Sequence, residues 1–470
     1  MKKIMFLINL LVFAFAGKTF AEDVARVGDA TYASLAAAVN AVPSGGTVTM
    51  IANTEVTSGT ISVGKIFTLD LNGKTVTGNF PGSYATVFDI KRTNGNLTIE
   101  DSSEEQSGKI TCVDNGQHII LIALHGILTI NGGTLVSPPN PANGCCVVSV
   151  AEAEAVLTVN GGIITSSKGK SSSSPYGVIN NLGTATINGG SIINTYSVSG
   201  MESRAIQNNS VLYAYSGSVK SSNEYALYSG SKGTVFMGSG LMMEGSVFIK
   251  NPITEYILTD NADFSLPTDL SVNKITYNRG NSNAFGTVCL PFVPDSKATI
   301  TYYTLKEADE NTLTLETVNN VEANTPYVYY TEDGTFNVSR ETVTTLSAGV
   351  TAGSVTSSNG WTLKGTYARI TVDEEDEPNS YYVKDNAFCK VNGNFKIKPL
   401  RAYFTAPSGA NSDRYEISVI DEATALSNLI DEGLSVRSIR DVNGMRHSKL
   451  QRGVNLVTMS NGITKKVIVK

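Results

Sequence analysis

The sequence predicts an all-β fold: a parallel β-helix, then an antiparallel β-sandwich-like domain, then a small C-terminal β domain. Three observations support this: a short motif recurs along the first half of the chain, its period is nearly constant, and Val, Ile, Thr and Gly dominate the period without a helical pattern. Regular recurrence of this kind is typical of a solenoid. Copies of the motif begin at Leu128, Leu157 and Ala185, with looser copies at Leu212 and Val235 and earlier ones at Leu69 and Leu97.

The period suits one rung of a parallel β-helix, meaning a circuit of three short strands joined by turns. Alternate residues of a strand face opposite sides, so both apolar positions of the motif should enter the core. The second of them falls, with spacings of 28, 31, 29, 28, 27 and 23 residues, at Leu71, Ile99, Ile130, Val159, Ile187, Ala214 and Met237. After each turn the chain should return to the core at Leu135, Ile164, Ile192, Val219 and Met242.

An asparagine column accompanies the repeat, at Asn131, Asn160 and Asn188. A corner between strands needs positive φ, which Gly accepts freely and Asn tolerates. Stacked rungs would place these amides about 4.8 Å apart, where each can bond the next as a ladder. Turn propensity alone is the other explanation of the column.

The chain divides into five predicted segments. Residues 1–21 carry Lys2 and Lys3, an apolar run and small residues before a cut, as in a secretory signal peptide. Residues 22–258 form the β-helix, capped at its open end by a short helix in 32–42 because terminal rungs must be covered. Residues 259–420 form the β-sandwich-like domain, with an acidic run at 373–377 in a hairpin loop. Residues 421–434 are a linker, and 435–470 form the C-terminal β domain.

Composition excludes several classes of function. The net charge of −6 leaves no basic stripe for nucleic acid, and no segment is amphipathic and basic enough to bind a membrane surface. Behind the signal peptide no apolar run is long enough to span a membrane. The signal peptide predicts an exported protein, with the periplasm as the weaker alternative to the cell exterior.

Five cysteines in an exported chain allow two disulfides and leave one over. Cys289 with Cys389 is one candidate pair, and either Cys145 or Cys146 can reach Cys112 from a neighbouring rung. Buried, unpaired thiols are an equal alternative, since Cys packs as a small hydrophobe. The spacings match no metal or redox motif, and we expect no cofactor.

Catalysis on this scaffold would require clustered carboxylates, either a pair for hydrolysis or several holding calcium for a lyase. No Asp occurs between Asp114 and Asp260, where most of the regular repeat lies. Glu202 with Arg204 is interpreted as a surface ion pair. We therefore predict no catalytic or metal site. The remaining case for an enzyme is a cluster drawn from Asp70, Asp89, Glu100, Asp101 and Asp114.

Three segments resemble adhesin-like surface proteins of Bacteroides, Prevotella and related bacteria. ATYASLAAAVNAVPSGGTVTMIANTEVT followed by LDLNGKTVTG resembles the start of their right-handed, pectate-lyase-like β-helix domains. FGTVCLPF, EANTPYVYY and LKGTYARITV are similar to a β domain near their C-termini. The tail resembles the C-terminal sorting domain of type IX secretion substrates through DVNG, GVNLV and KVIVK, although Arg440 stands where such tails carry an aromatic residue.

The resemblance implies an outer-membrane or extracellular destination and recognition of the tail by secretion machinery. The implied sorting residues are Asp441, Gly444, Gly453, Lys466 and Lys470. The expected function is a non-enzymatic, adhesin-like binding or scaffold protein, whose ligand is a glycan or a host or matrix protein. The alternatives are a polysaccharide lyase or glycoside hydrolase, and an inert stalk. Outward aromatic residues that suit binding are Tyr176, Tyr196, Tyr213, Tyr215, Tyr225 and Tyr228.

Overall fold

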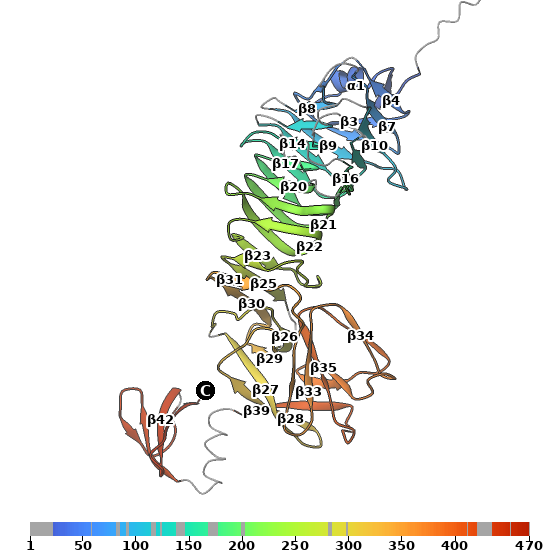
Figure 1. Cartoon of the computed structure of the whole chain (residues 1–470). Helices are drawn as coiled ribbons and strands as arrows, with labels where there is room; N and C mark the ends of the chain where they lie inside the picture. Colours follow the sequence, from blue (N-terminus) through green and yellow to red (C-terminus); the bar gives the residue numbers. More distant parts are fainter. Residues whose placement is uncertain are drawn as a thin grey trace, which may run out of the picture.

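The computed structural model confirms an all-β chain with one short helix among the residues that it describes. Those residues are 22–469 without 58, 81–84, 91–93, 114–118, 123–124, 138–145, 168–176, 199–202, 281–283, 298, 411, 421–434 and 452. Their strands form a 25-stranded sheet rich in parallel pairs, a ten-stranded sheet, a four-stranded sheet and two strand pairs. Figure 1 shows the first sheet extending from α1 toward the ten-stranded sheet.

In the 25-stranded sheet, called here the parallel sheet, each strand from β3 to β18 pairs in parallel with the strand three places later in the chain. The described strands thus make three stacks, consistent with a β-helix-like fold whose rungs contribute one strand to each stack. The first stack is β3 (Gly46–Met50), β6 (Ile66–Asp70), β9 (Asn96–Glu100), β12 (Ile127–Ile130), β15 (Val156–Val159) and β18 (Thr184–Ile187). The second is β4 (Thr54–Val56), β7 (Thr75–Gly78), β10 (Lys109–Cys112), β13 (Thr134–Val136), β16 (Ile163–Ser166) and β19 (Ser191–Asn194). The third is β5 (Ile61–Ser62), β8 (Phe88–Ile90), β11 (Ile120–Ile122), β14 (Val148–Val150), β17 (Ile179–Asn181) and β20 (Arg204–Asn208).

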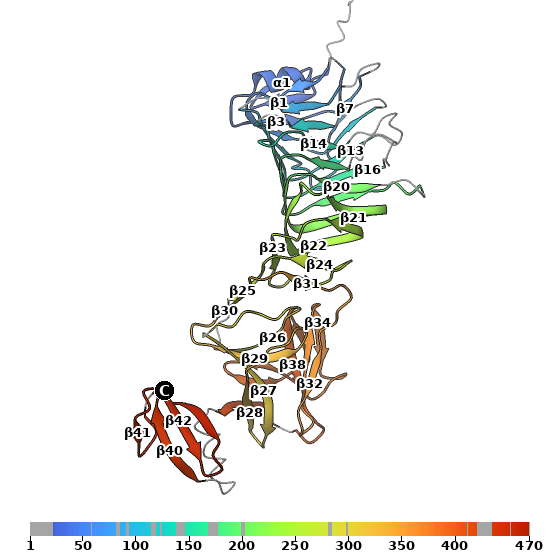
Figure 2. The ribbon, with the colours of Figure 1, turned by 60° about the vertical axis from the view of Figure 1, so that its left-hand side comes forward.

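All three stacks continue into β21 (Val211–Ser229), which pairs with β22 (Thr234–Ile249). These two long strands follow the path that three strands take in earlier rungs, with register shifts where they change direction. They are the longest strands of the stack and lie between β20 and β23 in Figures 1 and 2.

The core positions of the repeat follow the predicted alternation. Leu128 pairs with Leu157 and Ile130 with Val159, and all four side chains are fully buried. Their neighbours Thr129 and Thr158 are half-buried, as expected for the other face of the strand.

Two predicted register positions are wrong. Ile99 pairs with Leu69 rather than with Leu71, because an additional turn follows β6; Leu71 is nonetheless buried beyond the strand. Met242 is 69% exposed. An irregularity in β22 inserts one residue relative to β21, so Met243 and not Met242 aligns with buried Val219.

The Asn-Gly-Gly corners use both glycines for distinct reasons. The second glycine has positive φ, 76° at Gly162 and 74° at Gly190, whereas the asparagines do not. The prediction that the Asn column supplies positive φ is therefore wrong. The first glycine is required by close approach, since a Cβ on Gly161 would lie 2.4 Å from the carbonyl oxygen of Asn131 one rung earlier.

The predicted N-terminal helix is present but shorter, as α1 (Leu35–Ala41). The hydroxyl of Ser34 accepts a hydrogen bond from the amide of Ala37 and caps its first turn. Leu35, Ala38 and Val39 are buried. The helix covers the first strands of the sheet beside the antiparallel pair β1 (Ala25–Val27) and β2 (Ala30–Tyr32).

The parallel sheet does not stop at residue 258, where the sequence predicted a boundary. β22 pairs with β23 (Glu255–Leu258), which pairs in parallel with β25 (Ile275–Gly280), and β25 pairs antiparallel with β30 (Thr335–Arg340). β25 contains the ITYN segment that the sequence assigned to the next domain. A separate pair joins β24 (Leu270–Val272) to β31 (Thr344–Leu346).

The ten-stranded sheet contains most of the strands in residues 285–420, which were predicted to form a β-sandwich-like domain. Its neighbouring strands are antiparallel except for β28 and β39. Trp361, the single Trp of the chain, is 3% exposed in its core, 5.2 Å from Tyr381 and 5.1 Å from Tyr415 between ring centroids. In spatial order the strands are β26 (Phe285–Cys289), β29 (Pro326–Thr331), β27 (Ile300–Ala308), β28 (Thr312–Val318), β39 (Arg414–Ile420), β36 (Ala387–Lys390), β35 (Ser380–Lys384), β38 (Arg401–Thr405), β33 (Thr362–Thr366) and β32 (Ser354–Thr356).

The acidic run 373–377 is not a hairpin loop, because the strands on its two sides do not pair. β34 (Ile370–Asp373) pairs with β37 (Asn394–Ile397), so the run passes from one sheet to another. The C-terminal sheet has the order β41 (Arg446–His447), β40 (Val436–Asp441), β42 (Gly453–Met459) and β43 (Thr464–Val469). None of the described helical residues forms a segment that could cross a membrane.

We predict that Gly161→Ala lowers the free energy of unfolding by about 1–3 kcal/mol, the usual cost of overpacking, because its Cβ meets the backbone of the preceding rung. Gly409→Ala is the matched control, since an added Cβ there has no atom within 4 Å. Urea unfolding followed by circular dichroism compares the two. Equal stability of both variants would contradict the close-approach explanation.

Candidate functional site

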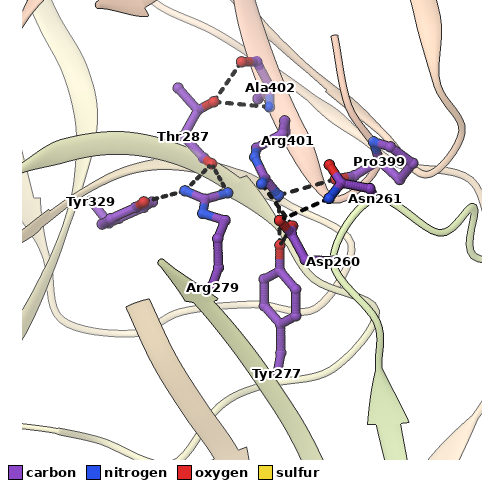
Figure 3. A network of polar contacts seen from close by, with 9 residues as sticks. All are labelled: Asp260, Asn261, Tyr277, Arg279, Thr287, Tyr329, Pro399, Arg401 and Ala402. Atoms are coloured by element: carbon purple, nitrogen blue, oxygen red, sulfur yellow. Dashed lines mark hydrogen bonds and ion pairs between the residues drawn. The ribbon is translucent and has the colours of Figure 1, made fainter. Parts of the chain in front are cut away.

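A polar network lies where the parallel sheet meets the ten-stranded sheet (Figure 3). Asp260 follows β23, Tyr277 and Arg279 lie on β25, and Arg401 begins β38. Alternation along β25 sends residues 275, 277 and 279 to its buried side. The network therefore joins segments more than a hundred residues apart in sequence.

Asp260 is the anionic centre of the network. One of its carboxylate oxygens accepts hydrogen bonds from the Arg401 guanidinium at 2.7 Å and from the Tyr277 hydroxyl at 2.9 Å. Arg401 also donates to Tyr277 and to the carbonyl of Pro399. Burial raises the pKa of Asp260, but the bonds and charge of Arg401, with the Tyr277 bond, outweigh it and hold this pKa below its usual value of 3.8.

Arg279 is the second cation of the network and is 5% exposed. Its guanidinium donates twice to the carbonyl oxygen of Thr287, at 3.2 Å each, and once to the Tyr329 hydroxyl. The guanidinium carbon lies 4.9 Å from the ring centroid of Tyr329 and 5.5 Å from that of Phe336. Its hydrogen-bond acceptors are thus neutral, although the side chain keeps its positive charge.

A cavity of about 290 Å³ opens onto these residues. Arg279, Arg401 and Asp260 form part of its wall, and the stacked rings of Tyr382 and Phe395, 3.9 Å apart, form another part. Lys396 and Lys398 are the other charged residues of its lining, and both are exposed. The arrangement suits binding of an anion. It does not suit acid catalysis, because Asp260 is held ionised.

Sequence analysis missed this site because its residues belong to no repeat and no motif. In the sequence Asp260 stood out only as the end of the stretch without Asp, and residues 275–280 only as part of the segment 259–420. The available signal was alternation in ITYNRG, which places a charged Arg279 on the same side as two apolar residues.

The predicted Asn column forms an exposed chain of amides. Asn160 donates to the side-chain oxygen of Asn131 at 3.0 Å, and Asn188 donates to that of Asn160 at 3.1 Å. The three amides thus lie one above another across successive rungs. This arrangement stabilises the corner and leaves a regular, neutral outer edge.

A second amide chain is buried, and sequence analysis missed it. Asn181 donates to Asn208 at 2.8 Å, and Asn208 donates to the Ser229 hydroxyl at 3.1 Å; all three side chains are fully buried. Each asparagine also bonds backbone groups of its corner. The spacing of 27 residues between the two asparagines equals one period, and that signal could have found them.

The early carboxylates serve turns of the backbone. Asp70 accepts from the amides of Asn72 and Ser102, and Asp101 accepts from the amide of Gly73 at 2.8 Å and from that of Gly108. Burial raises the pKa of Asp101, but these bonds and that of the Ser103 hydroxyl outweigh it and lower the pKa below 3.8. A general acid needs the opposite shift. Among the described residues no group of three or more His, Cys, Asp or Glu side chains is placed to hold a metal.

Two further predictions need correction. Arg204 is not at the surface: it is 6% exposed, and its guanidinium carbon lies 3.7 Å from the ring centroid of Tyr228. Cys289 and Cys389 are both free thiols, so the predicted disulfide is absent. Cys289 is buried against Gly365 on β33, whereas Cys389 lies near the backbone of Lys384 on β35.

Four of the predicted sorting residues lie in the described part of the C-terminal sheet or in its turn: Asp441, Gly444, Gly453 and Lys466. The Asp441 carboxylate accepts from the amides of Asn443 and Met445, both at 2.9 Å, and contacts the His447 ring at 3.1 Å. These contacts, the His447 bond first, lower the pKa of Asp441. Gly444 has φ of 82° in the turn. Gly453 begins β42, and Lys466 lies on β43.

Several predicted features lie outside the described residues, and the structure gives no information on them. They are the signal peptide 1–21, most of the two loop insertions 137–144 and 166–174, the linker 421–434, and Asp114, His118, Cys145, Tyr176, Glu202 and Lys470. Comparisons with protein-family models, curated proteins and solved structures give no match to this chain. Function is therefore inferred from the chain's own residues.

We predict that Asn208→Ala destabilises the protein more than Asn160→Ala. Asn208→Ala leaves the buried partners of Asn208 without a hydrogen bond and out of reach of water, so it should lower the free energy of unfolding by about 1–3 kcal/mol. Asn160→Ala is exposed and should lower it by about 0.5–1 kcal/mol. Thermal unfolding of both variants measures the difference. An unchanged melting temperature for Asn160→Ala would show that the outer amide chain contributes nothing, and a smaller effect for Asn208→Ala would contradict the burial argument.

We predict that Asp260→Asn costs about 1.5–3 kcal/mol at pH 7, because it removes the charged acceptor of Arg401. The control, Asp295→Asn, breaks a more exposed ion pair with Arg340 and should cost about 0–1 kcal/mol. Since the folded-state pKa of Asp260 lies below 3.8, its contribution is complete above that pH and is lost as the pH falls through the folded-state pKa. Urea unfolding at a series of pH values should show wild type and Asp260→Asn converging in acid.

Proposed function

We propose that this chain is an exported, cell-surface, non-enzymatic protein whose parallel sheet presents binding surfaces to a glycan. In this proposal the sheet is a right-handed parallel β-helix, the ten-stranded sheet is a sandwich-like domain, and the C-terminal sheet is a sorting domain for secretion. The proposal follows the resemblances of residues 30–78, 285–372 and 441–470, and a host or matrix protein is the other ligand class considered.

The observation that carries the proposal is a pair of aromatic groups on the outer side of β21 and β22. In the first group Tyr213 and Phe236 are aligned partners on the two strands, with ring centroids 4.6 Å apart and an interplanar angle of 22°. Tyr215 lies 6.1 Å from Tyr213. All three side chains are half-buried and lie opposite to the core positions of their strands.

The second group repeats this geometry further along the same two strands. Tyr228 and Phe248 are aligned partners with ring centroids 4.9 Å apart, and Tyr225 packs against both. Phe248 is 39% exposed. Aromatic rings beside hydroxyl and amide groups offer an apolar face and hydrogen bonds together, which suits the alternating CH and OH surfaces of a sugar.

An inert stalk would not need such residues on its outer side. Earlier rungs carry Thr129, Thr158 and Thr186 at the column where β21 and β22 carry Tyr213 and Phe236. Threonine satisfies the geometry of this column, so the aromatic side chains are an addition confined to β21 and β22. This contrast supports binding over spacing alone.

We predict that the double variant Tyr213→Ala and Phe236→Ala loses at least tenfold in affinity for the glycan that the full chain binds on a glycan array. A tenfold loss corresponds to about 1.4 kcal/mol, which two aromatic contacts supply readily. The affinity is measured by surface plasmon resonance with the glycan identified on the array. The control is Lys220→Ala, which breaks an exposed ion pair with Glu244 elsewhere on the same strands.

Three outcomes would contradict the proposal. Calcium-dependent release of unsaturated uronate from polygalacturonan by the full chain would show an enzyme. Binding that neither substitution changes would move the ligand away from these strands. The absence of binding to glycans and to matrix proteins would favour the inert stalk.

A further inference from the structure

Arg279 is a buried cation that the fold compensates with neutral acceptors and aromatic rings, without a carboxylate in contact. A charged residue that is only 5% exposed loses hydration, and a carboxylate within contact distance is the usual compensation. Arg279 instead bonds the Thr287 carbonyl and the Tyr329 hydroxyl. Asp260 is close enough for its pKa to be lowered by Arg279 but contacts Arg401 and not Arg279.

The cavity beside Arg279 carries an excess of positive charge. Four basic residues line it against one acidic residue, Asp260; Arg279 and Arg401 lie in the polar network (Figure 3), and the two lysines are exposed beside it. The Asp260 carboxylate accepts hydrogen bonds from Arg401 and Tyr277. It therefore pairs with one of the four cations and forms no ion pair with the other three. The basic lining residues are Arg279, Lys396, Lys398 and Arg401.

The rest of the wall selects the kind of anion. Tyr382 and Phe395 supply partly exposed aromatic surface, and the stacking of the two rings fixes their position. A bare inorganic ion gains nothing from such a wall, whereas a sugar ring packs its CH groups against it. The volume of about 290 Å³ is at the low end for ligand pockets and suits one sugar residue rather than a chain.

We propose that this cavity binds the carboxylate-bearing residue of an acidic saccharide, with the carboxylate between Arg279 and Arg401 and the sugar ring against Tyr382 and Phe395. A guanidinium has five N–H donors, of which Arg279 and Arg401 each use three in the bonds described, so each retains donors for a carboxylate. The inference rests on the proposed glycan-binding function and names a ligand class for a second surface, separate from β21 and β22.

Calorimetric titration of the full chain with methyl glucuronide and with methyl glucoside tests the inference. The two probes differ only at C6, which is a carboxylate in the glucuronide and a hydroxymethyl group in the glucoside. We expect the glucuronide to bind at least tenfold more tightly than the glucoside, and its affinity to fall as salt is added. Inorganic sulfate and phosphate should compete weakly, because they cannot use the aromatic wall.

Two variants assign the binding to the cavity. Arg279→Gln should weaken glucuronide binding at least tenfold, and the matched control Arg340→Gln, on the neighbouring strand β30 and outside the cavity, should leave it unchanged. Lys396→Ala is exposed and should weaken binding about threefold without affecting folding. It decides the question if Arg279→Gln fails to fold.

Equal binding of the two probes, or no glucuronide binding at all, would overturn the inference. Equal affinity for sulfate and glucuronide would show a general anion site and would also overturn the inference. Unchanged glucuronide affinity in both Lys396→Ala and Arg279→Gln would overturn it too. The glycan array separates this failure from that of the proposed function. Array binding that depends on Tyr213 and Phe236 but not on Arg279 would retain the proposed function and reject only the cavity.

Discussion

The structure depends on parallel backbone pairing between each strand and the strand one rung later. This pairing requires successive rungs to keep equivalent residues in register, so each column has one burial state along the stack, as Leu128, Leu157 and Ala185 show. It also brings corner backbones so close that the first glycine of Asn-Gly-Gly cannot carry a Cβ. The amide chains follow from the same constraint, because identical side chains one strand spacing apart can donate and accept in series. Core, corners and ladders are therefore consequences of one periodicity.

A strictly repeated surface offers a ligand no unique recess, since each rung presents the same outer residues as the next. Recognition requires a break in the pattern, and the chain breaks it in two ways. At β21 and β22 the outer threonine column gives way to Tyr213 and Phe236 while pairing continues. At β25 the parallel sheet ends against an antiparallel strand, and residues from the ten-stranded sheet close around Arg279. The candidate sites lie where the periodicity changes, and the regular rungs supply their rigid support.

The predictable part of this chain is the part fixed by period and alternation. The buried positions, the strands of both halves and the helix near residues 35–41 follow from local patterns. Met242 was misplaced because a one-residue irregularity reverses which side chain faces inward, and nothing in the sequence around Gly238 and Gly240 fixes its position. Leu71 was misaligned because Asp70 and Asp101 stabilise a longer turn through backbone bonds. The Arg401 and Asp260 contact joins residues 141 apart, a separation over which local patterns carry no information.

The boundary between the two large sheets shows why the candidate site could not be placed from sequence. The amino-acid composition changes near residue 260, but backbone pairing continues through β23 and β25 to β30. The position where the composition changes is therefore not the position where the parallel sheet ends. Covering the last parallel strand removes an exposed edge, which would otherwise pair with other chains. That cover buries Arg279 with neutral acceptors and sets Arg401 beside Asp260. Closing the end of the parallel sheet thus creates a concentrated positive charge beside a cavity, and the need to cover that end places the site at the junction.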